Sequence, residues 1–165
     1  MEFMKLLNSD QIKSWDEYTI NKLSINSFDL MEKAANACAN WISNAFNNKE
    51  ASFVVFCGPG NNGGAGMAIS RLLIKKGYGV RTYYLDSGNY SHDFTKNLTL
   101  LKGEAEASII KIIDLGSVEV KEGEIIIDAL FGSGLNRPLQ GFIATLITFL
   151  NGKKASRIAI DIPSG

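Results

Sequence analysis

The N-terminal part of the chain has two stretches in which apolar residues recur at helical spacing. In the first, Asn8 and Gln11 resemble a capping box that begins a helix. Its apolar face contains Ile12, Trp15 and Leu23. A second helix is predicted from about Asp29 to Phe46, with an apolar stripe that Trp41 broadens. We interpret both faces as core packing, and the alternative is that these helices form a dimer surface or a lid.

After residue 50 the pattern changes to short apolar runs that alternate with helical segments. Strands are predicted at Phe53–Cys57, Val80–Leu85, Ser108–Ile112, Glu124–Asp128 and Arg157–Ile162. Helices are predicted at Gly66–Lys76, about Ser91–Leu101 and Leu139–Leu150. This alternation is typical of βαβ units and a mainly parallel sheet. The strands are apolar on both faces, as expected when helices cover both sides, so we predict a three-layer α/β/α domain.

Composition narrows the class of protein. The 165 residues are enough for one domain with a core of its own. Lys+Arg and Asp+Glu are both 17, so the net charge is zero and the basic excess of a nucleic-acid-binding protein is missing. No apolar run approaches the ~20 residues that span a membrane. Residues 1–5 contain no long apolar stretch of a secretory signal, and the two cysteines read as buried thiols. We therefore expect a cytoplasmic protein.

The segment Gly58–Gly66 reads GPGNNGGAG and lies between a predicted strand and a predicted helix. Glycines let a backbone approach a phosphate closely, and a helix N-terminus points free N–H groups and a partial positive charge at it. The side-chain amides of Asn61 and Asn62 can bind a polar group or a cation. The segment therefore predicts a cradle for an anionic ligand.

Two further polar motifs follow predicted strands. The first is DALFGSGLNRP, from Asp128 to Pro138, and the second is DIPSG, from Asp161 to Gly165. In open parallel sheets, ligands bind at the carboxyl ends of the strands. Because the glycine loop has the same position, the three motifs predict one binding cleft at this edge of the sheet.

The glycine loop leaves one other enzyme class open. Gly58, Gly60 and Gly63 match G-x-G-x-x-G, and Asp86 ends the next predicted strand, where dinucleotide folds place a ribose-binding carboxylate. This pattern is compatible with an NAD-dependent oxidoreductase, although nothing resembles a hydride-transfer acid. A P-loop is excluded, because no Lys-Ser/Thr pair follows Gly63.

The strand-end carboxylates Asp128 and Asp161 have two interpretations. Either caps a helix or forms a turn, or one serves as a general acid/base while the other binds a cation. Asn62, Asp128 and Ser164 offer only oxygen ligands, which suit a hard cation, and a single carboxylate among them favours a monovalent ion. Arg137 is either a phosphate ligand or an exposed residue before a proline.

Together these motifs resemble the YjeF N-terminal domain family, the NAD(P)H-hydrate epimerases. That family has a G-x-G-N-N-G-G-D-G loop, a D-A-[LI]-[FL]-G-[ST]-G motif followed by R-P, and a D-[IL]-P-S-G motif. All three occur here in the same order, and the resemblance covers nearly the whole chain. It implies a Rossmann-like fold and interconversion of the R and S hydrates of NADH and NADPH in nicotinamide cofactor repair.

The resemblance also implies a site. By motif match, it places the following residues at the substrate: Asn61, Asn62, Gly63, Gly64, Ala65, Gly132, Ser133, Gly134, Leu135, Asn136, Arg137, Pro138 and Asp161. Asp161 is the candidate catalytic acid/base. Asn62, Asp128 and Ser164 would hold one potassium ion per subunit. The implied partners are an ADP- or ATP-dependent NAD(P)H-hydrate dehydratase, fused or separate, and a second copy in a homodimer.

Two features depart from the family pattern. The aspartate of the family's glycine loop is Ala65 in this chain, and the family segment after the third motif has no counterpart here. We therefore expect residues 1–165 to form a domain of this kind that is incomplete at its C-terminal end. The alternative to an epimerase is a non-catalytic nucleotide-binding or scaffold module with the same fold.

Overall fold

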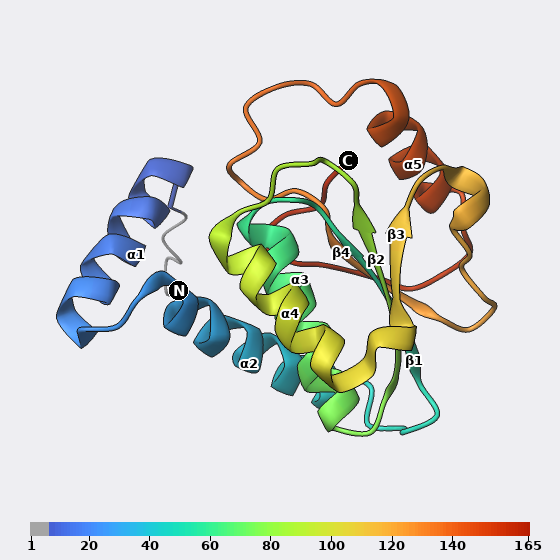
Figure 1. Cartoon of the computed structure of the whole chain (residues 1–165), viewed down its shortest axis with the longest axis horizontal. Helices are drawn as coiled ribbons and strands as arrows, with labels where there is room; N and C mark the ends of the chain where they lie inside the picture. The colour runs from blue at the N-terminus through green and yellow to red at the C-terminus, as the bar shows by residue number, and fades with distance from the viewer. Residues whose placement is uncertain (1–6) are drawn as a thin grey trace, which may run out of the picture.

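A five-stranded parallel sheet forms the centre of the computed structural model, with the strand order β3-β2-β1-β4-β5 (Figure 1). The structure describes residues 7–165, apart from the side chain of residue 107, so the expectation about residues 1–5 lies outside it. The strands are β1 (Ser52–Cys57), β2 (Gly79–Leu85), β3 (Ile109–Ile112), β4 (Ile125–Ala129) and β5 (Arg157–Ala159). All neighbours are parallel, as predicted.

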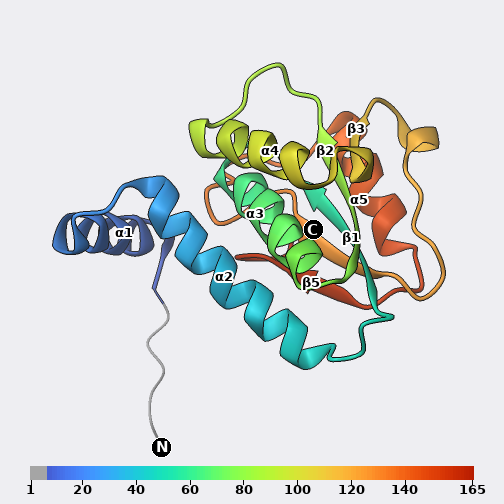
Figure 2. The same cartoon turned by 60° about the horizontal axis from the view of Figure 1, so that its bottom comes forward.

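Helices cover both faces of this sheet, which confirms the predicted three-layer Rossmann-like fold (Figure 2). The helices are α1 (Ser9–Leu23), α2 (Ser27–Ala45), α3 (Asn61–Lys75), α4 (His92–Ala105) and α5 (Gly141–Asn151), with 3₁₀ turns η1 (Glu106–Ser108) and η2 (Leu115–Ser117). Helices α2, α3 and α4 share one core, and α5 packs on the other face. In the described part of the chain, no helix is both long and apolar enough to cross a membrane.

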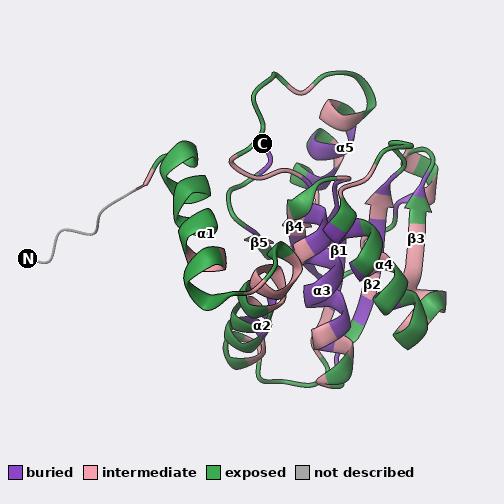
Figure 3. Ribbon diagram, turned by 60° about the vertical axis from the view of Figure 1, so that its left-hand side comes forward, coloured by how far each residue is buried: buried purple, intermediate pink, exposed green. Residues whose placement is uncertain are grey.

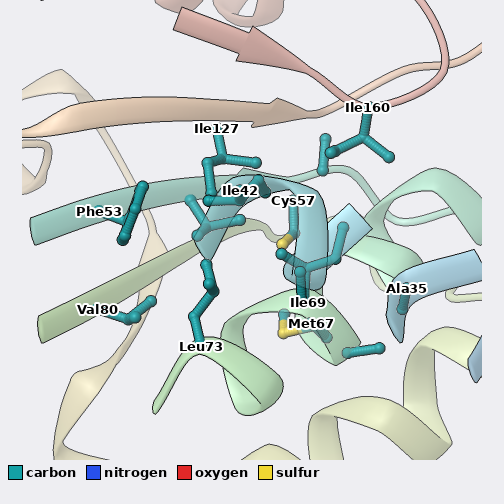
Figure 4. Packing of buried hydrophobic residues seen from close by; sticks show 14 of the residues in the cluster. Ala35, Ile42, Phe53, Cys57, Met67, Ile69, Leu73, Val80, Ile127 and Ile160 are labelled. Atoms are coloured by element: carbon teal, nitrogen blue, oxygen red, sulfur yellow. The ribbon is translucent and has the colours of Figure 1, made fainter. Parts of the chain in front are cut away.

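The central strand β1 divides the interior into two cores because its side chains alternate between the faces. Phe53, Val55 and Cys57 are fully buried on the α3 side, where Figure 4 shows Phe53 and Cys57 among residues from α2 and α3. Val54 and Phe56 are fully buried on the α5 side. Strand β1 therefore has no polar face, as the continuous apolar run predicts for a parallel strand covered on both sides.

The core-packing prediction is wrong for α1. None of its residues is buried, and the helix extends away from the sheet, exposed over most of its length (Figure 3). Trp15 and Tyr18 are 57% and 60% exposed. Helix α2 does pack, through Ala35, Ala39 and Ile42, although Trp41 is 61% exposed. Periodicity identified the apolar face of α1 correctly but could not tell whether this chain covers it.

Two of the element boundaries that differ from the prediction lie at the polar edge of the sheet. Helix α3 begins at Asn61 and not at Gly66, so residues 61–66 of the glycine loop are helical. Strand β5 ends at Ala159 and not at Ile162. The backbone N–H of Ile160 still donates to the Asp128 carbonyl at 2.8 Å, and Asp161 then turns the chain with a positive φ of 68°.

Candidate functional site

The three polar motifs surround one pocket of about 850 Å³, formed by the loops that follow β1, β4 and β5. This is the point where the strand order reverses, between β1 and β4, and open α/β sheets bind ligands there. The pocket includes Asn61, Asn62, Ala65, Gly132, Ser133, Gly134, Leu135, Asn136, Arg137 and Asp161 among its lining residues. Ten of the thirteen residues that sequence analysis placed at the substrate therefore line one cavity.

The other three residues have different surroundings. Gly63 and Gly64 are buried behind the wall, where their lack of a side chain permits close packing. A Cβ atom on Gly63 would overlap the carbonyl of Gly58, and one on Gly64 would come within 3.1 Å of the Phe94 backbone nitrogen. Pro138 lines a smaller neighbouring pocket of about 210 Å³. The two glycines therefore shape the loop from behind the pocket wall.

Helix α3 begins within the glycine loop, and its N-terminal end lines this pocket. Among the described residues, no side chain caps α3 at Gly60, and its first turn contains no acidic residue. Helices α1, α2 and α4 all have side-chain caps, from Asn8, Asn26 and Ser91. The first backbone N–H groups of a helix have no partner inside it. In α3 these groups stay available for an anionic ligand.

Asp128 and Ser164 form a compact hydrogen-bonded unit at the ends of β4 and β5. The backbone N–H and hydroxyl of Ser164 donate to the Asp128 carboxylate at 2.8 and 2.7 Å. The backbone N–H of Leu130 donates to the same carboxylate at 3.1 Å. The Phe131 N–H donates to the Ser164 hydroxyl oxygen at 3.0 Å. This unit fastens the DIPSG segment to the loop that carries half of the pocket wall.

Asp161 lies in the pocket in an unusual backbone conformation. Its φ of 68° is in the left-handed region, which few residues other than glycine adopt without cost. One carboxylate oxygen accepts a hydrogen bond from the Ser133 backbone N–H at 2.6 Å. Any side chain on Gly132 would collide with this carboxylate. The turn and Gly132 together hold an exposed carboxylate against the second loop.

The three predicted cation ligands lie in two places. The structure joins Asp128 to Ser164, while Asn62 lies on the pocket wall at the start of α3. The buried amide nitrogen of Asn62 has no hydrogen-bond partner among the described residues. Rotation of the amide exchanges its nitrogen and oxygen, and would place an oxygen in that buried position. An amide, a hydroxyl and a carboxylate oxygen fit a hard monovalent cation.

Sequence reasoning missed the part of the wall that comes from α2 and from apolar loop residues. Ala34 and Cys38 line the pocket from α2, and the remaining lining residues are Pro59, Gly60, Leu130, Phe131 and Ile160. Burial raises the pKa of the Cys38 thiol, so this side chain is mainly protonated at neutral pH and a weak nucleophile. Burial also raises the pKa of Cys57, which packs in the core. Among the described residues that line this pocket, Asp161 is the only carboxylate and stays the acid/base candidate.

Comparison with known proteins shows the family of this chain. The family model described as YjeF-related protein N-terminus matches residues 27–165. The chain belongs to this family. Among curated relatives, NAD(P)H-hydrate epimerase of Limosilactobacillus reuteri (strain ATCC 55730 / SD2112) is 37% identical over 161 residues, which are 98% of this chain and 74% of the relative. The protein of the same name from Oenococcus oeni is 36% identical over 160 residues, covering 96% of this chain and 74% of its own length.

A larger relative and a solved structure extend the comparison. The bifunctional NAD(P)H-hydrate repair enzyme Nnr of Salinibacter ruber is 32% identical over 173 residues, covering 97% of this chain but 32% of the larger enzyme. The crystal structure of the yeast protein ynu0 superimposes with a TM-score of 0.80 at 23% identity, covering 98% of this chain and 72% of that chain. At this identity, the yeast structure supports the fold alone.

Proposed function

We propose that this chain interconverts the R and S hydrates of NADH and NADPH, as an isomerase in nicotinamide cofactor repair. Curated relatives of this family, at 36–37% identity over nearly the whole chain, are named for that activity. The observation that carries the proposal is the exposed carboxylate of Asp161 in a pocket walled by all three family motifs. A pocket of about 850 Å³ is in the range of small-molecule and cofactor sites.

The proposed reaction requires few catalytic residues. Epimerisation at the hydrated ring carbon requires the hydroxyl to leave and to return on the opposite face. The neighbouring ring nitrogen stabilises the cation that forms in between. In our proposal the protonated Asp161 donates a proton to the departing hydroxyl, which leaves as water, and the resulting carboxylate accepts a proton when water adds back. The hydrogen bond from Ser133 orients the carboxyl group during both steps.

The remaining motif residues would bind the substrate and a cation. The open N-terminus of α3 and Arg137 suit the pyrophosphate of a dinucleotide. Asn62, Asp128 and Ser164 are our candidate ligands for one potassium ion per subunit. Bound there, the ion would supply positive charge to a site for an anionic substrate.

Three further proposals concern the setting of the reaction. A dehydratase would consume one of the two epimers, and the bifunctional relative from Salinibacter ruber is named for hydrate repair as a whole. Exposed aromatic residues on α1 and α2, such as Trp15 and Trp41, favour a homodimer through these helices. The two free cysteines suit a reducing cytoplasm.

One observation favours a second candidate, a binding module without catalysis. Ala65 is half-buried in the pocket wall, where the family motif has an aspartate. The chain therefore has one carboxylate fewer for contact with the substrate. A module would bind the hydrates without changing the ratio of epimers.

A coupled assay separates the two candidates. A dehydratase that consumes one epimer is added to mixed hydrates of NADH, and the recovered NADH is followed by its absorbance. Recovery should continue past the plateau set by that epimer, at a rate proportional to the concentration of this chain. An unchanged plateau would overturn the epimerase proposal, and hydrate binding in calorimetry would then support the module.

A further inference from the structure

A second pocket, of about 530 Å³, lies at the carboxyl ends of β2 and β3. It shares Pro59, Phe131 and Arg137 with the pocket that contains Asp161. The shared residues belong to the glycine loop and to the loop after β4, so the two pockets meet at the N-terminal end of α3. A ligand longer than the first pocket can therefore continue into the second without leaving the sheet edge.

The second pocket combines apolar walls with one carboxylate. Ile113 and Phe142 line it and are 78% and 39% exposed, so the core does not account for their position. Apolar walls of this kind suit a flat aromatic ring. The polar lining includes Asp86 and Ser87, directly after β2. A ring beside vicinal hydroxyls, as in adenosine, matches this combination.

The Asp86 carboxylate accepts hydrogen bonds from two residues that do not line the pocket. One oxygen accepts from the Tyr90 hydroxyl at 3.0 Å, and the other accepts from the Lys111 ammonium at 2.9 Å. The hydrogen bond from Lys111 lowers the pKa of Asp86 below its ordinary value, so the group is ionised at neutral pH. A carboxylate has about four acceptor positions, which leaves room for ribose hydroxyls. Lys111 itself is not among the residues that line the pocket.

We infer that this pocket binds the adenosine end of the dinucleotide and that Asp86 makes the chain selective for the hydrate of NADH over that of NADPH. The inference rests on the proposed function and adds the substrate preference to it. The hydrated nicotinamide would lie beside Asp161, the pyrophosphate beside Arg137, and the adenosine ribose beside Asp86. A free 2′-hydroxyl donates to the carboxylate, whereas a 2′-phosphate would place like charges together.

The test uses binding, so it does not depend on epimerisation. ADP-ribose and its 2′-phosphate derivative are titrated into the chain by calorimetry. The wild type should bind ADP-ribose at least about tenfold more tightly, a ratio that corresponds to ~1.4 kcal/mol. Asp86→Asn should bring the two dissociation constants within about threefold of each other, mainly by tighter binding of the 2′-phosphate form.

Two control variants separate the carboxylate from its ion pair. Lys111→Gln removes the same ion pair but keeps Asp86, so the variant should still bind ADP-ribose more tightly than its 2′-phosphate derivative. Glu104→Gln removes an exposed acid from an equivalent pair with Lys75, 2.7 Å long and away from both pockets, and should change neither constant. Circular dichroism would verify that each variant is folded.

The outcomes distinguish this inference from the proposed function. Equal affinity of the wild type for both ligands, no binding of ADP-ribose, or a preference that survives Asp86→Asn would overturn the inference. If the preference depends on Asp86 but the coupled assay shows no epimerisation, the adenosine subsite stands and the proposed reaction fails. If epimerisation occurs with equal use of both hydrates, the reaction stands and the role of Asp86 fails.

Discussion

Asp128 and Asp161 are carboxylates at the ends of neighbouring strands, yet their surroundings differ. Asp128 is half-buried and accepts hydrogen bonds from both Ser164 donors and from Leu130. Asp161 is exposed, occupies a left-handed turn, and accepts one hydrogen bond among the described residues. A carboxylate that accepts hydrogen bonds from several donors of the protein holds the surrounding loops together. A carboxylate with unoccupied acceptor positions can exchange a proton with a ligand. Without the family resemblance, the sequence presents them as equivalent strand-end aspartates.

The largest effect is expected for Asp161→Asn, which removes the proton donor and acceptor. Asparagine has nearly the same shape, tolerates the left-handed region and still accepts from Ser133. Epimerisation should slow by about 10²–10⁴-fold, the usual contribution of a general acid/base, while the unfolding midpoint in urea stays close to that of the wild type. Initial rates from chromatographically separated hydrates measure the effect. A folded variant with nearly normal rates would remove Asp161 from catalysis.

Asp128→Ala should act on stability. It leaves two backbone N–H groups of a partly buried unit without their acceptor, and leaves the Ser164 hydroxyl only the Phe131 carbonyl at 3.2 Å, at a cost of about 2–4 kcal/mol. Urea unfolding measures this change in the free energy of unfolding. The matched control is Asp114→Ala, which removes an exposed cap of η2 and should cost about 1 kcal/mol or less. Equal losses for the two variants would contradict a special structural role for Asp128.

Ser164→Ala should cause a smaller loss, about 1–2 kcal/mol. It removes one donor to Asp128 and the acceptor of the Phe131 N–H but keeps the backbone bond from residue 164. Ser133→Ala is the control on the Asp161 side, because Ser133 contacts Asp161 through its backbone N–H. That variant should unfold at the wild-type urea concentration. A loss of stability as large as that of Ser164→Ala would show that the Ser133 side chain stabilises the fold as much as the Ser164 side chain does.

The smallest effect is expected for Ala65→Asp. The new carboxylate would lie on the pocket wall at the fifth residue of α3, close to the helix N-terminus, where the helix dipole stabilises a negative charge by at most about 0.3–1 kcal/mol. If the missing carboxylate limits this chain, hydrate binding should tighten or turnover should rise by a few-fold. Ala65→Asn supplies a similar shape without the charge. Identical kinetics in both variants and the wild type would show that this position is dispensable.

The sheet was predictable because each apolar run is bounded by glycine or polar residues and separated from the next by a helical pattern. The start of α3 was not, because glycine is a poor helix former and the helical turn depends on the close approach of Gly58 and Gly63. The motifs predicted the loops around the pocket. The sequence did not predict that Cys38 lines the pocket, because an apolar stripe on a helix does not specify which part of the protein it faces.

The most direct test of the account begins with the separated S hydrate of NADH and follows the appearance of the R hydrate by chromatography, with and without this chain. The account predicts that the chain accelerates equilibration in proportion to its concentration and leaves the final ratio of epimers unchanged, as a catalyst must. Equilibration that is no faster with the folded protein than in buffer would contradict it.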